Sequence, residues 1–350
     1  MKLRAKLFVF FMLSACTLKG DLVPVYVGSN AGDCGLIVGE STDEIKDATV
    51  EQVVIYAKEH DYSDKKIKRN GIFVRYPDAI GTVLMCHGFM CNKHDQAFLR
   101  QMFPAGLYNV MSFDFRAHGD ERENQVSTLG QHEAHDVTAA VQFIKNHPKI
   151  KKEVPVYAYG FSMGAVAAIE AQAKDPSLFQ AMILDCPFES SENVIKRGLD
   201  HLKISIFGYI FDVPGKGLLE RYAFHPYVQS WVRMVLKAVA NMDTRDTSIM
   251  VSQFSPGTSV KKISIPVFFI HCKKDNRVSV DAIREIYNNI GSNYKLLWLT
   301  KGRGHFDSYF YSPEKYTERV REFLKIVADD RLNQANRREI IEDEEEKMVN

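Results

Sequence analysis

The chain has 350 residues, of which 45% are hydrophobic and 25% are charged, and its formal net charge is +1. This composition is that of a globular protein with room for one large α/β domain or two smaller ones, and it excludes fibrous and disordered proteins. A nearly neutral chain without a dense basic patch has little attraction for a phosphate backbone. Nucleic-acid partners are therefore not expected.

The first residues have the layout of an export signal. Basic residues at positions 2, 4 and 6 precede the apolar stretch 7–13, which is far shorter than the roughly 20 residues of a membrane-spanning helix. Residues 13–16 read Leu-Ser-Ala-Cys and look like a bacterial lipobox, in which the cysteine carries the lipid. We predict a signal peptide over 1–15 and a lipid anchor at Cys16. The protein would then be an exported, membrane-anchored lipoprotein, on the outer membrane or the cell surface in a bacterium. The alternative is an ordinary secretory signal.

Residues 16–50 are predicted to be a polar tether, and a regular pattern of short apolar runs follows it. An early β pair is expected at 53–57 and 71–76. Apolar runs bounded by turn residues then suit strands buried on both faces of a parallel sheet; they lie at 82–86, 109–113, 155–159, 181–184, 266–270 and 295–299. Helical patterns lie between them at 134–144, 163–174 and 316–327. The predicted fold class is α/β, a mostly parallel central sheet with helices on both faces.

One interval breaks this alternation. About 75 residues, 187–262, separate two predicted strands, which is far more than an ordinary connection. We interpret them as a helical cap, with one helix at 227–239, inserted into the domain 51–330, because a separate domain would not interrupt one sheet. The last segment, 331–350, includes the acidic run 342–346 and is expected to be a solvated charged tail.

The strongest chemical motif lies at residues 160–164, which read Gly-Phe-Ser-Met-Gly. It follows a predicted strand and precedes a predicted helix, as a nucleophile elbow requires. Such a turn exposes the serine hydroxyl and points helix N–H groups at developing negative charge. Ser162 is the candidate nucleophile.

A serine needs a base and an acid that orients the base. His305 lies in a glycine-flanked loop after the strand at 295–299, and Asp275 follows the strand at 266–270. Both are therefore expected at the carboxyl edge of the sheet, in the chain order nucleophile, acid, base. Asp185, at the end of the run 181–184, is the rival acid.

The motif at 87–89, His-Gly-Phe, follows the strand at 82–86. The backbone N–H groups of Phe89 and Met163 are expected to form the oxyanion hole, which typically contributes about 3–4 kcal/mol per donor. His87 is interpreted as a structural hydrogen-bonding residue.

These motifs together resemble the α/β-hydrolase superfamily over about 53–327, most of all its capped esterase-like members and the catalytic domain of prolyl-oligopeptidase relatives. The segment 114–119, Asp-Phe-Arg-Ala-His-Gly, and the run 265–271 before Asp275 add to the likeness. The resemblance implies structural roles for the polar side chains of 114–118. Ala117 and Cys272 stand where glycine is common, which weakens any subfamily assignment.

The predicted activity is hydrolysis of a carboxylic ester or thioester through an acyl-enzyme on Ser162, with a small acyl compound as substrate. Two alternatives stay open: a serine peptidase of small peptides, and a surface lipoprotein that keeps the fold without catalysis. No Cys-x-x-Cys or His-x-x-x-His spacing suggests a metal, and no cofactor is expected. Whether Cys34 and Cys91 form a disulfide cannot be deduced from the sequence.

Overall fold

The computed structural model describes residues 48–200, 252–329 and 337–343. Between 201 and 251 it describes 203–206, 209–212, 222, 224, 225, 227 and 250. The predicted signal peptide, Cys16, Cys34 and most of the predicted helix at 227–239 lie outside these residues. Within the described part of the chain, no helix combines the length and the apolar character needed to cross a bilayer.

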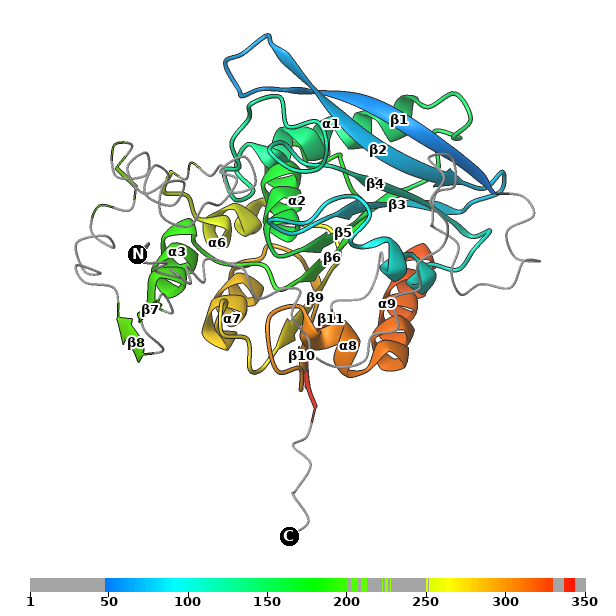
Figure 1. Cartoon of the computed structure of the whole chain (residues 1–350). Helices are drawn as coiled ribbons and strands as arrows, with labels where there is room; N and C mark the ends of the chain where they lie inside the picture. Colours follow the sequence, from blue (N-terminus) through cyan, green and yellow to red (C-terminus); the bar gives the residue numbers. More distant parts are fainter. Residues whose placement is uncertain are drawn as a thin grey trace.

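A single large sheet forms the centre of the described domain (Figure 1). Its strand order is β1-β2-β4-β3-β5-β6-β9-β10-β11. The hairpin β1–β2 is antiparallel, and β2 is antiparallel to β4, whereas all the later pairs are parallel. The strands are β1 (Thr49–Lys58), β2 (Lys66–Arg75), β3 (Gly81–Cys86), β4 (Tyr108–Phe113), β5 (Val156–Phe161), β6 (Ala181–Asp185), β9 (Val267–Cys272), β10 (Tyr294–Thr300) and β11 (Arg337–Glu342).

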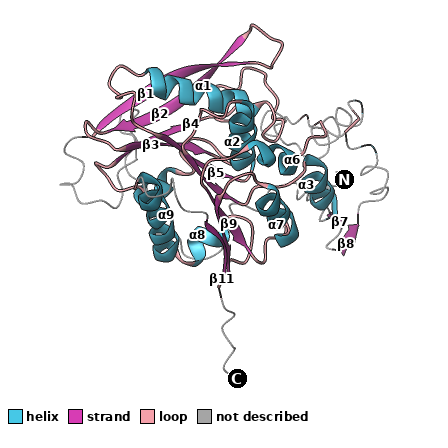
Figure 2. Ribbon diagram, turned by 180° about the vertical axis from the view of Figure 1, so that it is seen from behind, coloured by secondary structure: helices cyan, strands magenta, loops and turns pink. Residues whose placement is uncertain are grey.

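Helices cover both faces of this sheet (Figures 1 and 2). One face packs against α1 (Glu133–Asn146), α2 (Met163–Lys174) and α7 (Val280–Asn289). The other face packs against the 3-10 helix η1 (Ala97–Met102) and α9 (Pro313–Ala328). Successive strand residues alternate between the two cores, as strand geometry requires; in β9, Phe269 faces the first core, and its neighbours Phe268 and Ile270 face the second.

The fold class predicted from the sequence is confirmed, with element ends shifted by a few residues. Every predicted strand is present, and the helices predicted outside the insertion are found as α1, α2 and α9. The sequence prediction did not include α7 or the short α8 (Asp307–Tyr311). Ile283, Ile286 and Tyr287 of α7 do lie at helical spacing, whereas α8 is too short to carry a periodic signal.

The insertion between β6 and β9 is not purely helical in its described part. It begins with α3 (Ser191–Asp200) and continues into a two-stranded antiparallel sheet, β7 (Lys203–Ile206) and β8 (Tyr209–Asp212). The predicted helical cap therefore contains helices in its described part, together with a hairpin that the sequence prediction did not include. The stretch is rich in β-branched and aromatic residues, which favour strands. The insertion ends with α6 (Pro256–Ser259) and η2 (Val260–Lys262).

The C-terminal segment is not a solvated tail throughout. Residues 337–342 form β11, which pairs in parallel with β10 along 294–299. The Nε1 of Trp298 donates to Asp343 at 3.3 Å, and Lys315 contacts the same carboxylate at 2.6 Å. Of the acidic run, Glu342 and Asp343 are described, and they bind basic and indole groups at the edge of the sheet.

Candidate active site

The tight turn between β5 and α2 carries Ser162. Its φ is 51° and its ψ is −115°, a backbone conformation that non-glycine residues rarely adopt and that persists where the surroundings impose it. The N–H of Ser162 donates to the carbonyl oxygen of Asp185 at 2.8 Å. A Cβ at Gly164 would lie 2.0 Å from the carbonyl oxygen of Cys86, so only glycine lets the helix start so close to β3.

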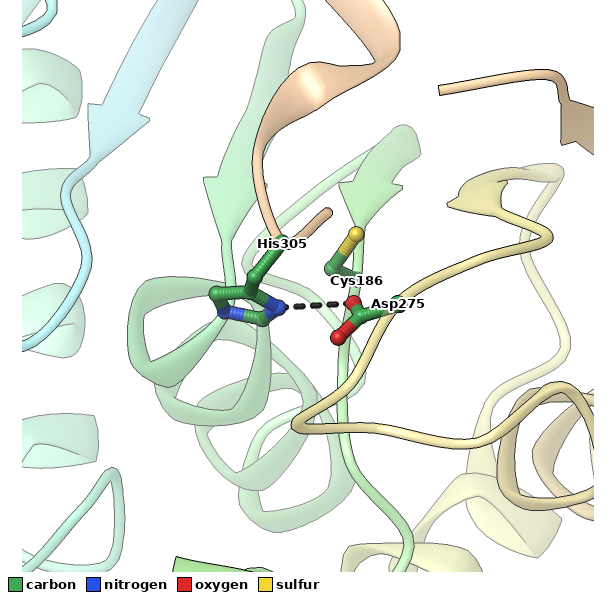
Figure 3. Close-up of side chains that lie close together, drawn as sticks. All are labelled: Cys186, Asp275 and His305. Carbon is green, nitrogen blue, oxygen red and sulfur yellow. Dashed lines mark hydrogen bonds and ion pairs between the residues drawn. The ribbon is translucent and has the colours of Figure 1, made fainter. Parts of the chain in front are cut away.

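Ser162, His305 and Asp275 form one hydrogen-bonded chain. The Nε2 of His305 lies 2.9 Å from the Oγ of Ser162, and its Nδ1 lies 2.7 Å from an oxygen of Asp275. Figure 3 shows the imidazole and the carboxylate facing each other. The Asp275 side chain is fully buried and that of His305 is 9% exposed. The structure thus brings together the three residues that the sequence singled out.

The second oxygen of Asp275 is held by the backbone. It accepts hydrogen bonds from the N–H groups of Arg277 at 2.8 Å and Val278 at 3.0 Å. Burial acts to raise the pKa of Asp275, but the charge and the hydrogen bond of His305 outweigh it and lower this pKa below its usual range. The carboxylate is therefore ionised at neutral pH and fixes the orientation of the imidazole.

Cys272 contacts both ends of the loop that carries His305. The sulfur of Cys272 lies 3.1 Å from the Oγ of Ser308, and a Cβ at Gly302 would lie 2.5 Å from that sulfur. Phe306, directly after the histidine, has a φ of +68°. The cysteine that departs from the usual glycine thus has a contact role in this chain.

The rival acid Asp185 has a different partner. It is fully buried, and the hydroxyl of Tyr316 donates to one of its oxygens at 2.8 Å. Burial raises its pKa to about 6. His305 directs its Nδ1 to Asp275, and the backbone carbonyl of Asp185 holds Ser162.

The predicted oxyanion hole lies where the loop after β3 meets the start of α2. A Cβ at Gly88 would lie 2.8 Å from the ring of Phe161, and one at Gly164 would lie 2.5 Å from the carbonyl oxygen of His87. This close packing places the loop with Phe89 against the first turn of α2, which begins at Met163.

Comparison with known proteins identifies the family. Residues 83–319 match the model of the alpha/beta hydrolase family. The chain belongs to this family.

Relatives and solved structures agree with that assignment. This α/β-hydrolase is 25% identical over 262 residues to the uncharacterized protein YqkD of Bacillus subtilis strain 168, covering 74% of this chain and 76% of YqkD. It resembles the esterase Pf2001 of Pyrococcus furiosus with a TM-score of 0.58 and 23% identity, over 83% of this chain and 96% of the esterase. Rv0554 of Mycobacterium tuberculosis gives a TM-score of 0.53 at 16% identity, over 78% and 99% of the two chains. Because these two structures are only 23% and 16% identical to this chain, the likeness shows a shared fold.

The segment 114–118 of this α/β-hydrolase supports neighbouring loops. The Nε2 of His87 accepts from the N–H of Phe115 at 3.1 Å, and burial lowers the pKa of His87 to about 3. His87 is therefore neutral and holds the loop next to Phe89. Arg116 pairs with Asp136 at 2.8 Å, and both side chains are buried.

Two buried charged residues that sequence reasoning missed also act on the site. Lys93 contacts Asp114 at 2.7 Å and holds the chain that follows Phe89. Glu133 accepts from Ser127 and Gly130 at 2.8 and 2.9 Å, and so fixes the loop 127–130 against α2. Neither belongs to a motif, so no signal in the sequence marked them.

Cys186 ends an apolar run, and the sequence indicates only a buried small hydrophobic residue there. It follows Asp185 with a φ of +51° and is fully buried. Figure 3 shows its side chain beside Asp275 and His305, and among the described residues these three place possible metal-ligating atoms within 4.8 Å of one another. The Nδ1 of His305 is already hydrogen-bonded to Asp275, so a metal there would compete with the triad.

Proposed function

We propose that this α/β-hydrolase cleaves a carboxylic ester or thioester through an acyl-enzyme on Ser162. The observation that carries the proposal is the continuous chain from the Ser162 hydroxyl through both nitrogens of His305 to Asp275. A serine hydroxyl is a weak nucleophile, and a positioned imidazole with an ionised orienting acid is the arrangement that activates it.

Each group then has a defined role. The Nε2 of His305 takes the Ser162 proton as Oγ attacks the carbonyl carbon, and Asp275 stabilises the resulting imidazolium. The N–H groups of Phe89 and Met163 stabilise the oxyanion. Collapse of the intermediate expels the alcohol or thiol, which receives the proton from Nε2. Water, activated by the same histidine, then releases the acid.

The esterase Pf2001 is among the structural neighbours of this chain, and this supports esters over peptides. A further support is the apolar character of the surroundings: Phe89 packs against a buried cluster that includes Val166, Phe188 and Val194. Such a setting suits an acyl group better than a charged peptide terminus.

A fluorophosphonate probe tests the nucleophile directly. We expect the wild-type protein to be labelled at Ser162, and Ser162→Ala to lose both labelling and ester hydrolysis, by about 10⁶ in turnover, while its circular dichroism is unchanged. Activity within tenfold of the wild type in this variant would contradict the proposal. A panel of p-nitrophenyl esters beside aminoacyl anilides separates esterase from peptidase activity.

A lipid anchor at Cys16 is the second part of the proposal. It rests on the sequence 13–16 and on the basic and apolar residues before it. Since stable anchoring takes more than one acyl chain, the processed cysteine would hold the enzyme at a membrane surface.

A further inference from the structure

A strip of aromatic rings runs from the candidate nucleophile to the protein surface. It consists of Phe161, Phe306, Phe98 and Phe310, and we call it the aromatic strip. Phe161 directly precedes Ser162, and its ring lies 5.1 Å from the imidazole of His305. The strip therefore begins in contact with the triad.

Ring contacts are continuous along the strip. Phe161 and Phe306 have their ring centroids 4.1 Å apart, and Phe306 lies 5.6 Å from Phe310 in an edge-to-face arrangement. Phe98 on η1 completes the strip at 6.2 Å from Phe306 and 5.5 Å from Phe310. Two elements far apart in the sequence, η1 and α8, thus contribute to one surface.

Exposure increases outward along this path. Phe161 is 6% exposed, Phe306 and Phe98 are half-buried, and Phe310 is 45% exposed. Phe310 is not needed to cover the core, because η1 and α9 already cover the core residues on this face of the sheet.

Phe161 faces both His305 and Gly88 of the loop after β3. Beyond it, the strip continues through Phe306, the residue after His305, and so lies on the histidine side of the nucleophile. The other side, next to Phe89, packs against the cluster that includes Val194 of α3. Helices α8 and α9 lie well apart from α3 in both views (Figures 1 and 2). Ser162 is therefore flanked by two separate apolar regions.

The chemistry of the proposed reaction indicates which part of the substrate binds in each of these two regions. The Nε2 of His305 must deliver its proton to the leaving oxygen or sulfur, so that atom has to lie within hydrogen-bond distance of Nε2. The rest of the leaving group then extends along the surface beside His305, which is the aromatic strip. The acyl group is left with the Phe89 side.

We propose that the aromatic strip is the leaving-group subsite and that it accepts esters or thioesters of flat, aryl-type alcohols or thiols. This inference rests on the proposed hydrolase activity of Ser162. Aromatic rings favour edge-to-face and offset contacts with other rings, and a substrate with one ring would reach Phe306, whereas a fused pair of rings would also reach Phe310.

The test keeps the acyl group constant. Phenyl acetate and 2-naphthyl acetate have leaving groups of similar acidity and give the same acetyl-enzyme, so their kcat/KM ratio reports leaving-group recognition during acylation. We expect the wild type to prefer 2-naphthyl acetate. Phe310→Ser should reduce this preference by about threefold to tenfold, with a larger loss for 2-naphthyl acetate than for phenyl acetate, whereas Phe310→Trp should retain the preference.

Tyr311→Ser is the matched control. Tyr311 is 41% exposed on the same short helix, but neighbouring helical residues point in different directions, so its loss should leave the ratio unchanged. An unchanged ratio in Phe310→Ser would overturn the inference. So would a change that follows acyl length, measured with p-nitrophenyl acetate and octanoate, because the strip would then hold the acyl group. A wild-type protein that neither hydrolyses these esters nor binds a fluorophosphonate would overturn the proposed function itself.

Discussion

Two buried carboxylates lie close to His305, and their environments give them opposite pKa shifts. Asp275 accepts hydrogen bonds from His305 and from two backbone N–H groups, and its pKa is lowered despite its burial. Asp185 accepts one from Tyr316, and burial raises its pKa to about 6. Ionised Asp275 is suited to stabilise an imidazolium, whereas Asp185 is suited to carry a proton at mildly acidic pH.

Replacing each carboxylate by its amide separates their roles. Asp275→Asn should lower turnover by roughly 10⁴, because the amide favours the wrong imidazole tautomer, whereas Asp185→Asn should cost far less. The measurement is kcat for a p-nitrophenyl ester with the active sites counted by a fluorophosphonate. The reverse order of the two variants would make Asp185 the orienting acid.

The pKa of Asp185 also predicts a pH dependence of stability. The usual aspartate value is 3.8 and the folded value is about 6, so the folded state binds this proton more tightly than the unfolded state does. The stability that results is fully present below the unfolded pKa and is lost as the pH rises through the folded pKa.

Asp185→Asn keeps an acceptor oxygen for Tyr316 and removes this titration. We expect its Tm to fall less than that of the wild type between about pH 4 and pH 7. Thermal unfolding followed by circular dichroism across that range gives the comparison. Parallel Tm curves for the two proteins would show that Asp185 does not titrate in this way.

At the scale of elements, β11 shows how a charged segment becomes part of a sheet. Its residues alternate in exposure: Ile340 is 46% exposed, whereas Ile341 is half-buried and packs against the core beside α9. The flanking Glu342 pairs with Arg284 at 2.9 Å and with Lys273 at 3.3 Å. The charges lie at the edge, and the apolar residue faces inward.

This alternation gives a matched pair of variants. Ile341→Ser should destabilise the domain by about 1 kcal/mol, since it removes a half-buried aliphatic side chain that packs against the core, and should lower Tm by about 2 °C or more. Ile340→Ser should change Tm very little. Equal effects of the two substitutions would mean that the side chain of Ile341 does not pack against the core.

The elements that the sequence predicted are those with a continuous local signal. Residues 82–86 and 266–270 are uninterrupted apolar runs, and β3 and β9 follow them closely. In contrast, β11 reads Arg-Arg-Glu-Ile-Ile-Glu, and its place depends on a partner strand about 40 residues earlier. A pattern with two apolar residues cannot indicate that pairing.

The residues of the candidate site could likewise be predicted only where the sequence carries a local signal. Ser162, Asp275 and His305 could be predicted because each follows a predicted strand, and the carboxyl ends of parallel strands lie at one edge. Lys93 and Glu133 could not be predicted, because their roles consist of contacts with Asp114 and with the loop 127–130. Phe98 likewise became part of the site only through its contact with Phe306.

At the scale of the whole molecule, the proposed anchor and the catalytic domain should be separable. The triad lies within 162–305, whereas Cys16 precedes the described domain. Cys16→Ser should therefore yield an enzyme with unchanged kcat/KM that partitions into the aqueous phase of a detergent extraction, while the processed wild type enters the detergent phase. Equal partitioning of the two proteins would leave only an ordinary secretory signal.

The order of the strands also decides how further domains could be attached. The chain enters the sheet at β1, which forms one edge, and leaves it at β11, which forms the opposite edge. A fusion partner placed before Thr49 and another placed after Asp343 would thus be separated by the full width of nine strands, about 38 Å at the usual spacing between strands. Two such reporters would monitor opposite sides of the enzyme, with the active-site strands β5, β6 and β9 between them.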